Sequence, residues 1–191
     1  MKIILVGYHG SQRIVPASKY LTNKYLVDEN NWLPRFEIIY LNYQGDINGW
    51  GEYVAGFLEY LTDDEVIFAL DDYLIAEQID MIKFNEAHKQ LKGDVVCVKL
   101  CESTPEEHEA YPVTTQYCIW NKAYLIYLLR TCQNPWGFEI NGSRIFDKIS
   151  IHFNCMKYFA NSAISARWEG VCLKGLKQED IDYIKQNDLI K

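Results

Sequence analysis

Apolar runs alternate with stretches of helical periodicity along most of the chain. Short runs of β-branched and leucine side chains predict buried strands at residues 2–6, 36–41, 65–70, 95–100 and 113–120. Helices are expected at 16–27, 50–61, 79–91 and 122–132, with two more that begin near Phe138 and at Gln178. This alternation predicts an α/β fold with a parallel sheet, because short helical crossovers join parallel strands.

The chain shows no boundary between two folding units. It contains no internal repeat and no low-complexity linker, and the polar stretch at 101–111 is typical of a loop. The region after Ile149 is less regular, with one further strand expected near 163–168. A chain of 191 residues buries enough surface for a self-sufficient core, so we expect one domain over residues 1–191.

Composition and charge narrow the class of protein. With 49% apolar and 24% charged residues, the chain has the make-up of an ordinary globular domain. No apolar stretch approaches the ~20 residues of a membrane span. Met1 and Lys2 lead into the first apolar run without a small-residue cleavage site, so we expect a cytoplasmic protein. A formal charge of −7 without any basic run argues against a nucleic-acid partner.

The six cysteines have the pattern of core residues. Most lie inside apolar runs, where a thiol behaves as a small hydrophobic group, and no CxxC motif is present. We expect reduced cysteines and no structural zinc site.

Candidate chemistry is sought where strands end, because ligands of open α/β sheets bind beyond the carboxyl ends of the strands. Asp71 and Asp72 directly follow one predicted strand, and Asn42 follows another. Adjacent carboxylates are tolerated best when a divalent cation with oxygen ligands neutralises them. A solvated acidic turn or a helix N-cap is the alternative interpretation of this pair.

The turn after the first strand, from Gly7 to Arg13, is a second candidate. Glycine allows backbone amides to approach a ligand closely, and Arg13 and Lys19 could neutralise phosphate. The spacing fits neither a Walker loop nor GxGxxG, so a plain strand-to-helix turn stays open as an explanation.

Two further residues are candidates with a structural alternative. Glu139 follows the break at 134–137 and could act as a general base beside Trp136. A carboxylate in the first turn of a helix is also favoured by the helix dipole alone. His152 is either an additional metal or phosphate contact or a structural histidine.

Three segments together resemble small GT-A-fold glycosyltransferases of bacterial surface-polysaccharide clusters and large DNA viruses. They are ALDDY at 69–73, TQYCIW at 115–120 and NPWGFEINGS at 134–143, and the similarity runs from about Gly7 to Trp168. The resemblance implies a GT-A-like, Rossmann-like, mostly parallel central sheet flanked by helices, with a less regular C-terminal part. It also implies a nucleotide-sugar-binding half at about 1–100 and an acceptor-side half at about 101–191.

The resemblance further implies an enzyme that moves a sugar from a nucleotide sugar, commonly a UDP-sugar, to a glycan hydroxyl with inversion. Family enzymes use a DxD-type motif with Mn²⁺ or Mg²⁺. Here the motif is Leu70-Asp71-Asp72, which resembles the variants in which the last aspartate holds the metal. Asp72 is therefore expected to bind the metal, and Asp71 to contact the ribose or the metal and its water.

The same resemblance assigns the remaining residues. Those expected to border the nucleotide are Gly7, Tyr8, His9, Arg13 and, near the base or ribose, Asn42. Glu139 would deprotonate the acceptor hydroxyl, and Trp136 would offer an apolar face to a sugar ring. One alternative is a sugar nucleotidyltransferase, whose glycine-rich signature residues 10–19 resemble faintly. Another is a non-catalytic module that binds a nucleotide sugar or a glycan.

Overall fold

A six-stranded sheet forms the centre of the molecule. The computed structural model describes residues 1–8, 13–26, 36–101, 112–145, 150–156, 158–160, 173 and 175–190. The strands of the sheet, in spatial order, are β2 (Glu37–Tyr43), β1 (Lys2–Tyr8), β3 (Glu65–Leu70), β6 (Cys118–Asn121), β5 (Cys97–Cys101) and β7 (Ser150–Met156). All neighbours pair in parallel except β6, which is antiparallel to both β3 and β5. The expected mostly parallel α/β sheet is confirmed.

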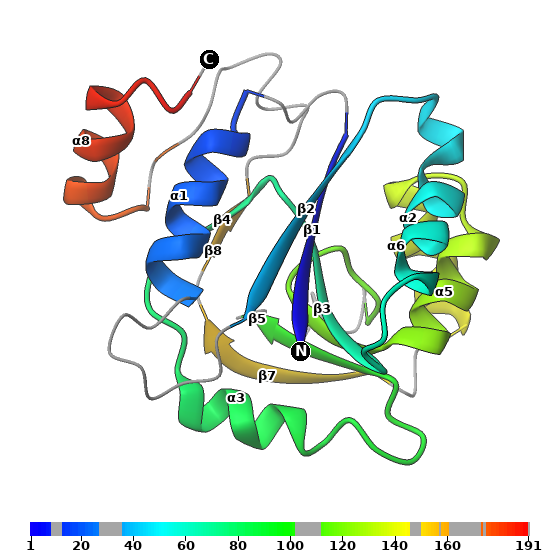
Figure 1. Ribbon diagram of the computed structural model, residues 1–191. Helices are drawn as coiled ribbons and strands as arrows, with labels where there is room; N and C mark the ends of the chain where they lie inside the picture. Colours follow the sequence, from blue (N-terminus) through cyan, green and yellow to red (C-terminus); the bar gives the residue numbers. More distant parts are fainter. Residues whose placement is uncertain are drawn as a thin grey trace.

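Helices cover both faces of this sheet (Figure 1). They are α1 (Val15–Leu26), the short 3-10 turn η1 (Ile47–Gly49), α2 (Trp50–Glu59), α3 (Met81–His88), α5 (Lys122–Thr131), α6 (Pro135–Ile145) and α8 (Gln178–Gln186). Figure 1 shows α1 on one side of the sheet and α2, α5 and α6 together on the other. None of the described helices is long and apolar enough to cross a membrane.

The continuous apolar runs of the strands result from this double coverage. In β1, Ile3 and Leu5 belong to the core beneath α1, while Ile4 and Val6 belong to the core beneath α2, α5 and α6. All four side chains are fully buried. A strand that is buried on both faces has no polar face, so the sequence shows a run rather than an alternation. Cys97, Cys101, Cys118 and Cys132 are buried thiols of these cores, as expected, whereas the other two cysteine side chains lie outside the described residues.

Several boundaries differ from the sequence expectations. The strand expected at 113–120 is confined to β6, because residues 112–117 leave the ladder as bends. The helix expected near Phe138 begins at Pro135, whose missing amide is tolerated at a first helical position. Strands β7, β4 (Tyr73–Ile75) and β8 (Tyr158–Ala160) were not expected, and β4 and β8 pair as a separate two-stranded sheet. The loop expected at 101–111 and the strand expected near 163–168 fall outside the described residues, apart from Cys101.

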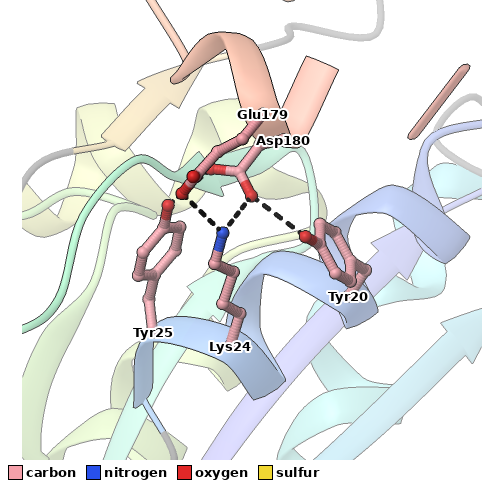
Figure 2. A network of polar contacts seen from close by, with 5 residues as sticks. All are labelled: Tyr20, Lys24, Tyr25, Glu179 and Asp180. Atoms are coloured by element: carbon pink, nitrogen blue, oxygen red, sulfur yellow. Dashed lines mark hydrogen bonds and ion pairs between the residues drawn. The ribbon is translucent and has the colours of Figure 1, made fainter. Parts of the chain in front are cut away.

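The C-terminal helix α8 is fixed to α1 by one buried carboxylate (Figure 2). Asp180 is fully buried and accepts hydrogen bonds from the Tyr20 hydroxyl at 3.1 Å, the Lys24 ammonium at 2.7 Å and the Tyr25 hydroxyl at 2.5 Å. The Lys24 ammonium also lies 3.0 Å from the exposed Glu179 carboxylate. We call these five side chains the α1–α8 clasp.

Candidate active site

The carboxyl ends of β2, β1 and β3 lie side by side at one edge of the sheet. Asn42 and Gly7 are partners in the ladder of β2 and β1. The amide of Asp71, just beyond β3, donates to the Val6 carbonyl at 3.2 Å. Candidate residues from three separate segments are therefore adjacent along this edge.

The two aspartates are buried at this edge, and their charges affect the pKa values of different tyrosines. Asp71 is 2% exposed and Asp72 is 5% exposed, in the turn between β3 and β4. Burial, and to a smaller degree the charge of Asp71, raises the pKa of Tyr40 to about 12. Burial, together with the charges of Glu139 and Asp72, raises the pKa of Tyr73. The charges of Asp72 and Glu139 thus both raise the pKa of the Tyr73 hydroxyl.

The segment before β6 joins this edge because β6 runs opposite to its neighbours. An antiparallel strand begins where the parallel strands end, so residues 112–117 lie at the edge that carries Asp71 and Asp72. The Leu70 amide donates to the Thr115 carbonyl at 3.0 Å, which fastens this segment directly to the end of β3.

Helix α6 brings Glu139 to the same place. The Asn134 side chain accepts from the Gly137 amide at 2.8 Å, which satisfies an amide of the first turn. Phe138 is fully buried, with ring centroids 6.2 Å from Trp50 and 5.8 Å from Trp120, both edge-on. This anchor sets the rotation of α6 and leaves the neighbouring Glu139 partly buried at the sheet edge.

One oxygen of the Glu139 carboxylate accepts three hydrogen bonds. Its Oε1 accepts from the Thr115 amide at 2.8 Å, from the Thr115 hydroxyl at 2.8 Å and from the Thr114 hydroxyl at 3.1 Å. These bonds fix the plane of the carboxylate, and all of them use Oε1. Within the described part of the chain no hydrogen bond engages Oε2, which is the arrangement that a general base needs.

The donor set at 71–72 is compatible with a divalent cation that is bound together with a phosphate group. Mg²⁺ and similar ions take oxygen ligands, and typically use one or two carboxylates plus substrate phosphates rather than a cage made only of protein. Asp71 and Asp72 supply such carboxylates from one turn. Within the described part of the chain there is no group of three or more His, Cys, Asp or Glu side chains that could hold an ion.

The remaining predicted site residues lie in the turn before α1, on α1 and on α6, or outside the described residues. Arg13 is exposed in the turn before α1, and Trp136 is 46% exposed one turn before Glu139 on α6. The Lys19 ammonium lies 4.8 Å above the Tyr40 ring. His9 and the side chains of Tyr8 and His152 lie outside the described residues.

Sequence reasoning missed the hydroxyl groups around Glu139. The sequence patterns assign no role to Thr114, Thr115 or Tyr73. Tyr73 ends the ALDDY segment, Thr115 begins the TQYCIW segment, and Thr114 directly precedes it. Ligand-binding side chains of open α/β sheets are expected after strands, whereas the two threonines precede one. A pair of hydroxyl residues ahead of an antiparallel strand is the signal that could have found them, had the direction of β6 been known.

Comparison with solved structures finds GT-A-type glycosyltransferases and a cytidylyltransferase. The apo-form glycosyltransferase GlyE of Streptococcus pneumoniae TIGR4 matches with a TM-score of 0.49 and 11% identity, over 80% of this chain and 45% of that chain. A cytidylyltransferase from Leptospira borgpetersenii serovar Hardjo-bovis matches with a TM-score of 0.49 and 10% identity, over 99% and 95%. The glucosyl-3-phosphoglycerate synthase of Mycobacterium tuberculosis, in complex with Mn²⁺ and UDP-glucose, matches with a TM-score of 0.47 and 11% identity, over 84% and 71%.

This chain therefore spans about half the length of GlyE. No family model matches the chain, and no curated protein matches its sequence.

Proposed function

We propose that this protein is a glycosyltransferase that moves a sugar from a nucleotide sugar, with a UDP-sugar as the favoured donor, to a hydroxyl of a glycan acceptor. The reaction is metal-assisted and inverts the configuration of the transferred sugar. Residues 1–100 then form the donor half of one domain, and residues 101–191 the acceptor half.

The observation that carries the proposal is the junction between β3 and the segment before β6. Through the Leu70–Thr115 hydrogen bond, the edge that carries Asp71 and Asp72 continues into the residues that hold Glu139. A cation-binding acidic turn beside an oriented carboxylate is the pair of groups that transfer from a nucleoside diphosphate requires: one side for the leaving diphosphate and one for the attacking hydroxyl.

In this mechanism Asp72, together with Asp71, would hold Mn²⁺ or Mg²⁺ on the donor side of the site. The cation, when bound, supplies positive charge that stabilises the departing nucleoside diphosphate. Glu139 accepts the proton of the acceptor hydroxyl at Oε2, while the acceptor oxygen forms its bond to the anomeric carbon. The bond from that carbon to the diphosphate oxygen breaks on the opposite side, and the bonding electrons leave with the nucleoside diphosphate.

The exposed face of α6 suits the acceptor. Trp136 and Ile140 are 46% and 47% exposed and lie one turn apart, on either side of Glu139 in the sequence. Aromatic rings stack on the apolar faces of sugars, so Trp136 would hold a ring beside the carboxylate. Gly7, Tyr8, His9, Arg13 and Asn42 are proposed to border the nucleotide on the donor side.

The test is a turnover assay with UDP-sugars, Mn²⁺ and a set of glycan acceptors. We expect UDP release that depends on the acceptor and is lost in both Asp72→Asn and Glu139→Gln. Glu139→Gln keeps the side chain's shape, so donor binding measured by calorimetry should stay within about threefold of the unmodified protein, whereas Asp72→Asn should lose metal-dependent donor binding.

Other outcomes would overturn the proposal. Release of pyrophosphate from a sugar phosphate and a nucleoside triphosphate would identify a sugar nucleotidyltransferase. Binding of nucleotide sugars without transfer or hydrolysis would identify a binding module. Full activity in both variants would show that the reaction takes place at another site.

A further inference from the structure

The hydroxyl group of Tyr73 is linked to Glu139 through Thr115. The Tyr73 hydroxyl lies 3.3 Å from the Thr115 hydroxyl, and the Thr115 hydroxyl lies 2.8 Å from Oε1 of Glu139. Tyr73 directly follows Asp72 in the sequence. Two hydrogen bonds therefore link the residue that follows the acidic turn to the carboxylate on α6.

The direction of this chain follows from the number of protons. A threonine hydroxyl has one proton to donate, and an ionised carboxylate can only accept. Since Thr115 donates its proton to Glu139, the Tyr73 hydroxyl must be the donor to the Thr115 oxygen. That donation occupies a lone pair of the Thr115 oxygen. It favours the rotamer in which the Thr115 hydroxyl points its proton toward Oε1 of Glu139.

The tyrosine is itself held in place from two sides. Its backbone pairs with Ala160 in the two-stranded sheet of β4 and β8. Its carbonyl accepts from the Tyr117 hydroxyl at 3.3 Å. The backbone of Tyr73 is consequently fixed directly beside the turn at 71–72, which limits where its hydroxyl can lie.

We propose that Tyr73 is a positioning residue, whose hydroxyl orients Thr115 toward Glu139 and ties the base to the turn that carries Asp72. This inference rests on the proposed function, since it concerns the same base. Its consequence is that the acidic turn and the orientation of the base are linked through this hydroxyl pair as well as through the Leu70–Thr115 backbone bond.

The decisive variant is Tyr73→Phe, which removes the hydroxyl and keeps the ring. We expect kcat to fall about fivefold, as for the loss of one hydrogen bond of about 1 kcal/mol, while KM for the donor stays within twofold. Thr115→Val should lower kcat at least as far, and Thr115→Ser, which retains the hydroxyl, should restore most of it. The double variant Tyr73→Phe/Thr115→Val should be no slower than Thr115→Val alone.

Tyr20→Phe is the matched control, because it removes a tyrosine hydroxyl with a hydrogen bond of similar length in the α1–α8 clasp. It should leave kcat unchanged. The inference is overturned when Tyr73→Phe keeps full kcat, when Tyr20→Phe lowers kcat equally, or when Thr115→Ser fails to restore activity.

A second measurement separates this inference from the proposed function. Unfolding by urea of Tyr73→Phe, Thr115→Val and the double variant gives a coupling between the two hydroxyls that needs no substrate. Absence of coupling in an active enzyme overturns only the positioning role of Tyr73. Coupling in a protein that turns over no nucleotide sugar overturns the proposed function instead.

Discussion

Replacing Asp180 by asparagine should loosen the attachment of α8 more than any other single change in the α1–α8 clasp. The carboxylate is fully buried and accepts hydrogen bonds from Tyr20, Lys24 and Tyr25. Asparagine keeps the shape but removes the charge, and its amide can satisfy only part of this set of donors. A hydrogen bond to a charged group is worth about 1.5–3 kcal/mol, so we expect a loss of about 3 kcal/mol in the free energy of unfolding.

For a chain of this size, that loss corresponds to a fall of roughly 6–12 °C in Tm, measured by circular dichroism or calorimetry. Glu179→Gln is the matched control, since Glu179 contacts the same ammonium at 3.0 Å but its side chain is 66% exposed. Exposed ion pairs contribute about 0–1 kcal/mol, so Tm should change by at most a few degrees. Equal losses for the two variants would refute the reasoning, because burial would then not determine the strength of the contact.

The same carboxylate predicts a dependence of stability on pH. Burial alone would raise the pKa of Asp180, but hydrogen bonds from Lys24, Tyr25 and Tyr20 outweigh it and lower the pKa below its ordinary value of 3.8. A lowered pKa in the folded state stabilises the protein above the unfolded-state value, and this contribution is lost as the pH falls through the folded-state pKa. Below about pH 4, urea unfolding should therefore lose stability less steeply in Asp180→Asn than in the unmodified protein.

Two further predictions concern the core. A Cβ at Gly51 would collide with the backbone carbonyls of Cys132 and Leu129, so Gly51→Ala should lower the free energy of unfolding by about 2–3 kcal/mol. At Gly56 on the same helix a Cβ meets nothing within 4 Å, so Gly56→Ala should raise the free energy of unfolding by about 0.5–1 kcal/mol. Urea unfolding of both variants measures the contrast, and equal effects would contradict it.

The order of elements could be predicted from the sequence because local patterns determine it. Continuous apolar runs mark β1 and β3, and the helical spacing from Trp50 onward marks α2. The sequence predicts a later start for α6 than Pro135 because a proline indicates a break, although proline suits a first helical turn that the Asn134 side chain caps.

The surroundings of Glu139 could not be predicted, because they depend on pairing between distant segments. The contact of Thr115 with Glu139 requires that β6 run antiparallel to β3, and the pattern of 113–120 fits either direction. Tyr73 has the same difficulty, since its position depends on pairing with Ala160 far along the chain. The sequence predicts candidate site residues at strand ends, whereas tertiary structure brings in the side chains that orient Glu139.

The pairing of β3 with β6 also covers a strand edge that β3 would otherwise expose. Without residues 118–121 beside it, β3 would be the outer strand of a three-stranded parallel sheet, and Val66 to Leu70 would form an apolar edge. Such an edge is a template for pairing with another chain. Asp71 and Asp72 place two like charges directly at its end, where charged residues are known to discourage edge-to-edge association. The acidic turn that is proposed to serve the donor would thus also discourage association through β3 whenever β6 is not in place.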